Sequence, residues 1–409
     1  MKQAIGCRLR VTQDFFYWPL ALILFFSTNS CYYINLSSKR GDQALELLAA
    51  LLPLCVSMMV GACRIEGRSA IPKLILVAGV VFLLMPKALL AGTIVGFVFR
   101  MVVMFGLYVM LVATMRAGGL FDVLVKFEKT TVVFAAISLF FWLFGEILHL
   151  IPPSGTIAND WSGGETISNY FYLHFGAQGQ RNCGVFCEAP MYNLVLCSAL
   201  FVELFVRASV SRARLLVLVA TIATTMSTTG QLVTMGSLFV RFFVMRKRKA
   251  SAWSVMFWAI VSLASLVAVA YASKYIMEEK ATGASYAVRA AYMLKELRAF
   301  ASSPILGHGF LTFTFGSSNS ICPILAEGGL VQFALYSSAM LLLPYYGLHG
   351  RHRNLLCFFV FYFTAFSITI CHYNPLTQFV MAMGLCRLFV SGRKYESLFQ
   401  PKGAALMRP

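Results

Sequence analysis

Apolar stretches long enough to cross a lipid bilayer recur along the whole of this 409-residue chain. Hydrophobic residues make up 59% of the sequence and charged residues only 12%, which excludes a soluble globular fold of this size. Backbone polar groups in lipid must be hydrogen-bonded internally, so these stretches are predicted to be helices. The predicted fold class is therefore an all-α polytopic membrane protein.

The apolar pattern predicts about twelve transmembrane helices. They are expected near residues 15–35, 43–63, 71–86, 93–115, 131–151, 188–208, 213–227, 230–245, 252–273, 322–346, 355–371 and 375–391. The two stretches that meet at Gly230 are also compatible with one interrupted element. The first stretch lacks a small-residue cleavage pattern, and we expect it to remain as the first span.

The distribution of Lys and Arg predicts the orientation, because cytoplasmic loops retain cations. Placing both termini in the cytoplasm puts most basic clusters there, including Lys126, Lys129 and the run Arg246 to Lys249. Topology then accounts for most of the net charge of +18, and anionic lipid headgroups account for a smaller share. These charges therefore do not indicate nucleic-acid binding.

This topology divides the chain into five parts. Residues 1–151 carry the first five spans, 152–187 form a long external loop, and 188–273 carry four more spans. Residues 274–321 form a second long external loop, and 322–409 carry the last three spans and a cytoplasmic tail. Six of the nine external cations lie in the two long loops, where the insertion bias does not explain them, so we expect the functional site there.

The second external loop carries the pattern of an amphipathic helix from Ala284 to Ala301, which Pro304 ends. Its polar side is predicted to carry Arg289, Tyr292, Lys295, Glu296 and Arg298. External guanidinium groups suit a diphosphate, because their planar fork matches phosphate oxygens. The alternative is an interfacial helix whose cations extend to lipid headgroups.

Three ordered motifs carry a family resemblance. S-P-I-L-G-H-G-F (Ser303 to Phe310), followed by S-N-S-I-C-P-I-L-A-E-G-G-L-V (Ser318 to Val331), resembles the C-terminal signature of the O-antigen ligase and Wzy-type polysaccharide polymerase superfamily. R-N-C-G-V-F-C-E-A-P-M-Y-N (Arg181 to Asn193) is similar to an R-x-x-G-x-F-x-E-P element of polymerases, and S-T-T-G (Ser227 to Gly230) to a further family segment.

The resemblance implies a membrane glycosyltransferase of GT-C type, working without cofactor or metal in the inner (cytoplasmic) membrane. Its substrate would be an undecaprenyl-diphosphate-linked oligosaccharide. Arg181 and Arg289 would lie near the diphosphate, with Glu188 beside them. A repeat-unit flippase and a chain-length regulator are the implied protein partners, besides the lipid bilayer.

The resemblance assigns further residues to the site. Lys295 and Arg298 would be supporting cations, and Tyr286 and Asn319 would contact substrate. Glu327 would fix the start of the tenth span and pair with an arginine. Where the family has His followed by Asn, this chain has Ser318 before Asn319, so the nearest titratable substitute for the usual base is His308; a merely exposed His308 is the alternative.

Buried ionisable residues give two further hypotheses, and the cysteines one observation. Glu146 and His149 lie at i and i+3 and would line an acceptor cleft, unless they are only structural. Arg100 and Glu203 are one possible intramembrane pair. Cys183 and Cys187 form an external C-x3-C pair, without a second pair that would indicate a metal site.

Two other functions stay open at this point. A ligase that transfers a finished glycan to another acceptor would share the motifs. A flippase or transporter of lipid-linked oligosaccharides would share the twelve spans, but such a protein is expected to show two similar halves with binding groups near mid-membrane. We find no internal repeat in the sequence, which favours the polymerase.

Overall fold

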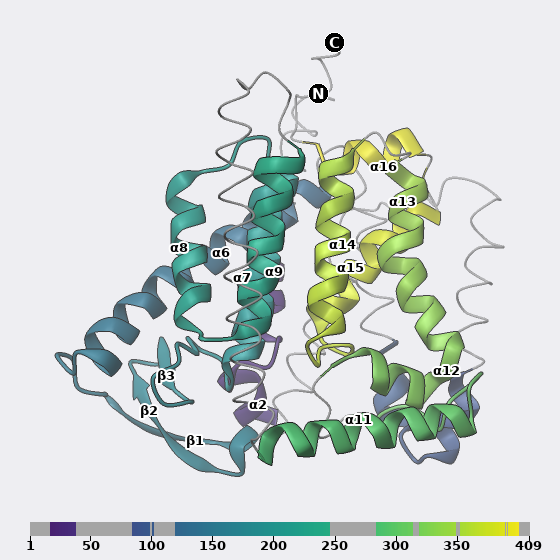
Figure 1. Cartoon of the computed structure of the whole chain (residues 1–409), viewed down its shortest axis with the longest axis horizontal. Coiled ribbons are helices and arrows are strands. Elements are labelled where there is room, and N and C mark those ends of the chain that lie inside the picture. The colour runs from purple at the N-terminus through teal and green to yellow at the C-terminus, as the bar shows by residue number, and fades with distance from the viewer. Residues whose placement is uncertain are drawn as a thin grey trace, which may run out of the picture.

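The computed structural model describes residues 17–37, 84–98, 100–101, 119–245, 284–313, 319–348, 352–388, 390 and 392–400. In these residues the protein is mostly helical. A bundle of steep helices stands over a foot made of a small β-sheet and one helix that lies across the bundle (Figure 1). The predicted spans at 43–63 and 252–273, and most of those at 71–86 and 93–115, lie outside the described residues.

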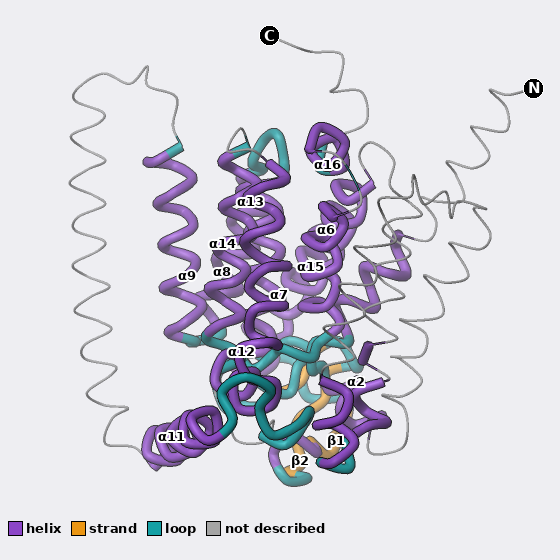
Figure 2. The backbone as a smooth tube through the Cα atoms, turned by 90° about the vertical axis from the view of Figure 1, so that its right-hand side faces the viewer, coloured by secondary structure: helices purple, strands orange, loops and turns teal. Residues whose placement is uncertain are grey.

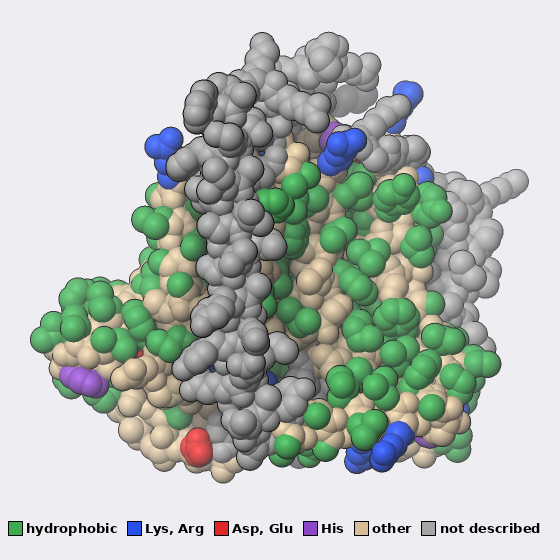
Figure 3. Space-filling view, viewed as in Figure 1, with side chains coloured by type: hydrophobic (Ala, Val, Ile, Leu, Met, Phe, Trp, Pro, Cys, Tyr) green, Lys and Arg blue, Asp and Glu red, His purple; other side chains and the backbone are tan. Residues whose placement is uncertain are grey.

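Three described helical stretches are long and apolar enough to cross a membrane, namely Gly119–Ile147, Ala189–Val206 and Ile321–Leu348. Two shorter apolar helices, Tyr17–Phe26 and Arg353–Ser367, accompany them. Figure 3 shows hydrophobic side chains along the flank of the bundle, whereas the visible Lys and Arg side chains lie at its two ends. These features indicate association with a membrane.

The first predicted span is shorter than expected. Its helix ends at Phe26, and after a turn a second helix, α2 (Cys31–Ser37), begins. The turn contains Asn29 with a positive φ of 56° and Ser30, which forms an isolated β-bridge with Phe186. The chain therefore leaves the bundle early, because residue 30 pairs with a distant backbone segment instead of continuing the helix.

The fifth predicted span begins earlier than expected. Helix α6 (Gly119–Phe141) continues into the π-helical turn η1 (Trp142–Ile147), so Lys126 and Lys129 lie on the helix and not in a loop. The ammonium group of Lys126 lies over the rings of Tyr17 and Trp18, at 5.3 and 5.9 Å. Hydropathy placed the boundary too late, because it counts charges without seeing their partners.

Helix α7 (Ala189–Phe201) and its π-helical extension η3 (Val202–Val206) lie at the centre of the bundle and are almost wholly buried. Helices α8 (Arg212–Thr224) and α9 (Thr228–Phe239), the latter extended by η4 (Val240–Val244), pack beside it. α8 and α9 are two separate helices, and the break between them contains Met226 with a φ of 50°. Gly230 lies inside α9, so it does not mark the break.

A buried cluster of four charges joins α6, η3 and α8. The carboxylates of Glu128 and Glu203 are inaccessible to solvent, and both face the guanidinium groups of Arg207 and Arg214 at 2.5 to 3.2 Å. The suggested pair of Arg100 with Glu203 is therefore wrong. Arg100 donates a hydrogen bond to the backbone carbonyl of Tyr373 instead, at 3.0 Å.

The C-terminal third supplies the other side of the bundle. Its elements are α12 (Ile321–Ser337), η5 (Ser338–Leu342), α13 (Leu343–Leu348), α14 (Arg353–Ser367), α15 (Pro375–Leu385), η6 (Cys386–Leu388) and α16 (Gly392–Leu398). Helix α12 is interrupted at Gly329, which has φ 61° and ψ −156°. The predicted spans near 322–346, 355–371 and 375–391 correspond to these helices.

The first long loop contains a β-sheet, so the prediction of an all-α protein is wrong there. Strands β1 (Gly155–Asn159), β2 (Glu165–Tyr170) and β3 (His174–Gly176) pair antiparallel in this order, with Ile157 opposite Ile167. The strands are only three to six residues long, too short to produce a clear periodicity in the sequence.

The predicted amphipathic helix is present as α11 (Ala284–Ser302). It lies across the foot of the bundle, at the same end as the β-sheet (Figures 1 and 2). The helices α8, α14 and α16 begin at the opposite end (Figure 1), and their first residues include Arg212, Arg353 and Arg393. The basic N-terminal ends of these three helices and the two long predicted loops thus lie at opposite ends of the bundle.

Candidate functional site

The first component of the site is the segment that leads into α7. Arg181 lies in this segment, half-buried; its Nε donates to the carbonyl of Thr225 at 2.9 Å, and one terminal nitrogen donates to Oε1 of Gln178 at 3.2 Å. The same Oε1 accepts the backbone N–H of Ala189 at 3.2 Å, one of the N–H groups that the start of α7 leaves without a helical partner. Arg181 and the start of α7 are thus positioned together.

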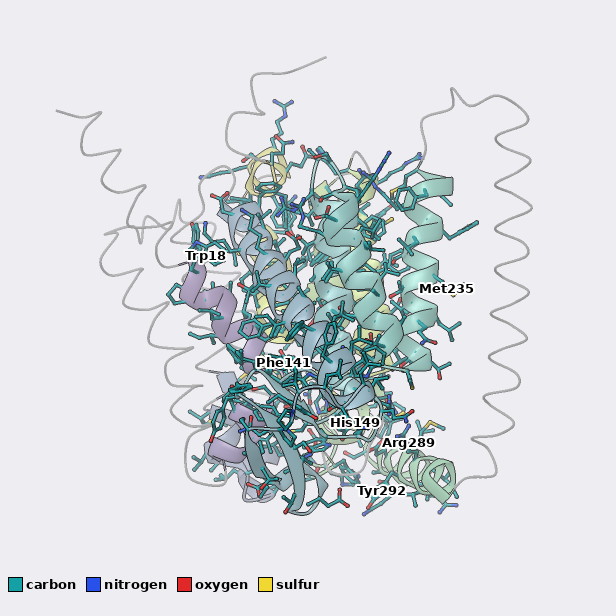
Figure 4. All side chains as sticks on the ribbon, turned by 90° about the vertical axis from the view of Figure 1, so that its left-hand side faces the viewer. Trp18, Phe141, His149, Met235, Arg289 and Tyr292 are labelled. Carbon is teal, nitrogen blue, oxygen red and sulfur yellow. The ribbon has the colours of Figure 1, made fainter. Side chains whose placement is uncertain are left out.

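Glu188 and Arg289 complete this cluster of charges. Glu188 precedes α7 in an extended conformation, and its side chain makes no capping hydrogen bond. Its carboxylate interacts electrostatically with the guanidinium groups of both Arg181 and Arg289. Figure 4 shows Arg289 on α11, at the foot of the bundle. The structure therefore brings together three residues that lie up to 108 positions apart, since 289 − 181 = 108.

Burial and the neighbouring charges have opposite effects on the pKa of Glu188. Partial burial raises the pKa of Glu188, while Arg289 and Arg181 oppose this shift. Burial also lowers the pKa of Arg181, and the neighbouring Arg289 lowers it further. Two cations that interact electrostatically with one partly buried carboxylate leave an excess of positive charge. Such an arrangement can bind an anion that offers several oxygens.

The S-T-T-G segment (Ser227 to Gly230) and the end of α8 before it pack directly against the motif Arg181 to Asn193. The backbone N–H of Asn182 donates to the carbonyl of Thr224 at 3.0 Å, and its side chain donates to the Thr224 hydroxyl at 3.0 Å. One turn into α9, Gly230 touches Asn193 of α7 so closely that an added Cβ would lie 1.7 Å from Nδ2. The glycine is required for this contact between helices, because any side chain would displace α9 from α7.

In the motif from Ser303 to Val331, the backbone of the G-H-G turn (Gly307 to Gly309) lies in close contact with the backbone of α12. The N–H groups of His308 and Gly309 donate to the carbonyls of Ala326 and Glu327 at 2.9 and 2.8 Å. A Cβ on Gly307 would lie 2.3 Å from the backbone of Glu327. The spacing P-x-x-G-x-G followed by E-G-G thus has a structural reason: it lets two backbones approach where a side chain would not fit.

Glu327 differs from its predicted role. Its carboxylate is buried, accepts a hydrogen bond from the Tyr373 hydroxyl, and accepts the Phe313 backbone N–H at 2.9 Å. Its described partners are therefore a tyrosine and the backbone, where we expected an arginine. The Tyr373 hydroxyl also accepts a hydrogen bond from Gln332 at 3.1 Å. This network stabilises the break in α12 and the loop before α15.

His308 lies at the other end of α11 from Arg289. Its Nε2 lies 2.9 Å from both the Ser302 hydroxyl and the Ala299 carbonyl. Ten residues of helix separate Arg289 from Ala299, which corresponds to about 15 Å. His308 thus fixes the C-terminal end of α11, remote from Arg181 and Glu188, and any direct part in chemistry at the arginine cluster would require a large movement.

The remaining predicted residues of the second loop have mixed placements. Lys295 and Arg298 are exposed on α11, while the side chain of Tyr286 lies outside the described part of the structure. Glu296 is buried, so its predicted place on the polar, outward side of the helix is wrong. Asn319 caps α12, because its Oδ1 accepts the N–H of Cys322 at 2.8 Å.

Glu146 and His149 do not share a helix face. The helix ends at Ile147, and His149 is exposed with a φ of 53°. Glu146 instead lies 3.0 Å from Nε2 of His174, a fully buried residue of β3. The prediction that Glu146 and His149 share a helix face is therefore wrong, and Glu146 attaches the β-sheet to η1.

Sequence reasoning missed Gln178, Thr225 and Tyr373, each of which contacts a predicted site residue. Gln178 lies three residues before Arg181, and Thr225 lies two residues before the S-T-T-G segment. Extending each motif by one helical turn would have included both. Tyr373 has no such signal, because it reaches Glu327 from a loop 46 residues away.

No protein-family model and no curated protein matches the sequence. The resemblance to the ligase and polymerase superfamily therefore depends on the motif residues alone.

Proposed function

We propose that this protein is a polysaccharide polymerase of the cytoplasmic membrane. It joins undecaprenyl-diphosphate-linked oligosaccharide repeat units on the outer membrane face and releases the lipid diphosphate. The proposal includes about twelve spans in a GT-C-like arrangement, with both termini in the cytoplasm. The single observation that supports it most is the electrostatic interaction of Glu188 with both Arg181 and Arg289, which joins the segment before α7 to α11 at the foot of the bundle.

In the proposed reaction, a sugar hydroxyl of one lipid-linked unit attacks the anomeric carbon of the growing chain. A new glycosidic C–O bond forms, and the bond from the anomeric carbon to the diphosphate oxygen breaks. Arg181 and Arg289 neutralise the negative charge that develops on the leaving diphosphate. Because diphosphate is a good leaving group, this stabilisation and the alignment of the two sugars supply much of the rate.

Glu188 is proposed to receive the proton that the attacking hydroxyl loses. Its pKa is raised by burial, which makes its carboxylate a better proton acceptor than an exposed one. The two arginines are proposed to hold this carboxylate and the diphosphate in one site. The exposed Lys295 and Arg298 of α11 are proposed to attract the anionic lipid headgroup before it reaches the cluster.

The central test is turnover by the purified full-length protein, in the presence of a chelator, of a synthetic undecaprenyl-diphosphate repeat unit made with the host's own sugars. We expect a ladder of glycan lengths on a gel, with release of undecaprenyl diphosphate. A ladder that forms only after another acceptor is added would support the ligase instead. Transport of the lipid into the opposite leaflet without any new glycosidic bond would support the flippase.

A cellular test uses Arg181→Ala and Arg289→Ala in a strain that lacks the chromosomal copy. We expect surface glycan of single repeat units from both variants. Full-length polymer from both variants at normal protein levels would refute the proposal.

A further inference from the structure

The thiols of two cysteines far apart in the sequence meet at the foot of the bundle. Cys31 is the first residue of α2, and Cys187 immediately precedes Glu188. Their Sγ atoms lie 3.4 Å apart, and both side chains are buried, with exposures of 1% and 0%. The sequence relates Cys187 to Cys183 only by their C-x3-C spacing, whereas the contact in the structure joins Cys187 to Cys31.

Backbone pairing holds the two segments in register around these thiols. Ser30 forms an antiparallel β-bridge with Phe186, and the N–H of Cys31 donates to the carbonyl of Val185 at 2.9 Å. A disulfide has an S–S distance of about 2.05 Å, so the two sulfur atoms would have to approach by about 1.4 Å. A bond between them requires that rotation of the two side chains supplies this movement.

The position along the membrane normal favours oxidation. The foot of the bundle carries the two long loops that the Lys and Arg distribution predicts to be external, and disulfides persist in oxidising, extracytoplasmic compartments. Two other buried cysteines have a different setting: Cys197 lies in the middle of α7, and Cys386 is the first residue of η6, directly after the C-terminal end of α15. There, Cys serves as a small apolar residue.

We propose that Cys31 and Cys187 form a structural disulfide bond in the mature protein. It would tie the start of α2 to the segment that carries Arg181 and Glu188. The proposal depends on the outward orientation of the foot, which the proposed function also requires. It does not depend on the reaction that the site performs.

The oxidant in this proposal is a disulfide of the extracytoplasmic space, carried by a protein or by a small molecule. The two thiols give up two electrons and two protons, the Sγ–Sγ bond forms, and the oxidant's disulfide is reduced to two thiols. Because both thiols are buried after folding, this exchange takes place while α2 is still undocked. The hydrogen bond with Cys31 and burial raise the pKa of the Cys187 thiol, which argues against a nucleophilic role in the folded protein.

The direct test is thiol mapping of the full-length protein. Cells are lysed into denaturant with N-ethylmaleimide and no reductant, and the protein is digested and analysed by mass spectrometry before and after reduction. We expect a peptide pair that links Cys31 to Cys187 and separates on reduction, while Cys197 carries the maleimide. Maleimide on both Cys31 and Cys187, or a link from Cys187 to Cys183, would overturn the proposal.

Thermal unfolding in detergent gives a second readout. Reductant is expected to lower the unfolding temperature of the wild type by on the order of 10 °C, because the bond closes a long loop. A Cys31→Ser/Cys187→Ser double variant should show no such response, whereas the matched control Cys197→Ser should keep it. An equal response of the double variant and the wild type would overturn the proposal. Glycan assays on the same preparations decide the proposed function separately.

Discussion

Replacement of Arg289 by alanine tests the arginine cluster most directly. Arg289 is exposed on α11 and interacts electrostatically with Glu188 and Arg181. Its removal leaves the backbone and the packing of α11 unchanged, because its side chain is not part of the core. Any loss of activity then reports on charge, not on folding.

The magnitude follows from Coulomb's law. A unit charge about 4 Å from a diphosphate oxygen contributes about 1 kcal/mol in water and about 4 kcal/mol at the effective dielectric constant of a protein surface site. Because Arg289 is exposed, we expect a value between these limits, roughly 1.5 to 3 kcal/mol. This corresponds to a ten- to hundredfold loss in the rate of glycan elongation.

The assay is the initial rate of elongation by purified protein on a synthetic lipid-diphosphate repeat unit. Arg212→Ala is the control, since Arg212 is an exposed arginine at the start of α8, which lies at the opposite end of the bundle. We expect at most a threefold loss from the control. A rate for Arg289→Ala within twofold of the wild type, or an equal loss in both variants, would refute the reasoning.

The same variant has a second, independent readout. Arg289 opposes the rise in the pKa of Glu188 that burial causes. If the ionised carboxylate accepts the proton, activity is lost as the pH falls through the pKa of Glu188. Removing Arg289 raises this pKa further, so the acid limb of the pH–rate profile should move to higher pH. An acid limb that does not move would show that Arg289 does not influence the pKa of the group that accepts the proton.

Three further predictions concern stability. Burial raises the pKa of Glu188 above 4.5, so the ionised carboxylate is disfavoured in the folded state, and Glu188→Gln should raise the unfolding temperature at pH 7.5 by roughly 1–3 °C. This gain should disappear below about pH 4.5, where the carboxyl group is protonated in both the folded and the unfolded state. A gain that does not depend on pH would contradict this cause. In the buried charge cluster of α6, η3 and α8, Glu203→Ala leaves Arg207 and Arg214 with only Glu128 as a carboxylate partner and should destabilise the protein by about 3 kcal/mol. The control Arg212→Ala, at an exposed position, should cost under about 0.5 kcal/mol. Equal unfolding temperatures of the two variants in detergent would refute this prediction. Gly307→Ala places a Cβ 2.3 Å from the Glu327 backbone at a φ of 64° and should cost about 2–4 kcal/mol, while Gly155→Ala, which has open space, should unfold at nearly the wild-type temperature.

Local patterns predicted much of the helical structure. The helices of the C-terminal third and α11 lie close to where the apolar and amphipathic periodicity placed them, because a helix that faces lipid must satisfy its backbone internally. The boundaries were less predictable. α6 extends past Lys126 because that ammonium group lies over Tyr17 and Trp18, and a hydropathy average does not include such contacts.

The candidate site was predicted in part. The motifs around Arg181 and Arg289 were identified from the sequence, and the structure brings their charges together. His308 and Glu146 were assigned by their type and spacing, yet they contact Ser302 and His174 respectively. A titratable side chain takes its role from the partner that the fold supplies, and spacing along the chain does not reveal that partner.

The sequence alone determined that this chain is helical and associated with a membrane, because hydrophobicity and backbone hydrogen bonding act locally. Only the tertiary structure decided which distant groups interact: Glu188 electrostatically with Arg289, and Glu327 with Tyr373 and Cys31 with Cys187 through contacts. These interactions join segments from 46 to 156 residues apart, the last from 187 − 31 = 156. No local pattern encodes them, because they depend on how the whole bundle packs.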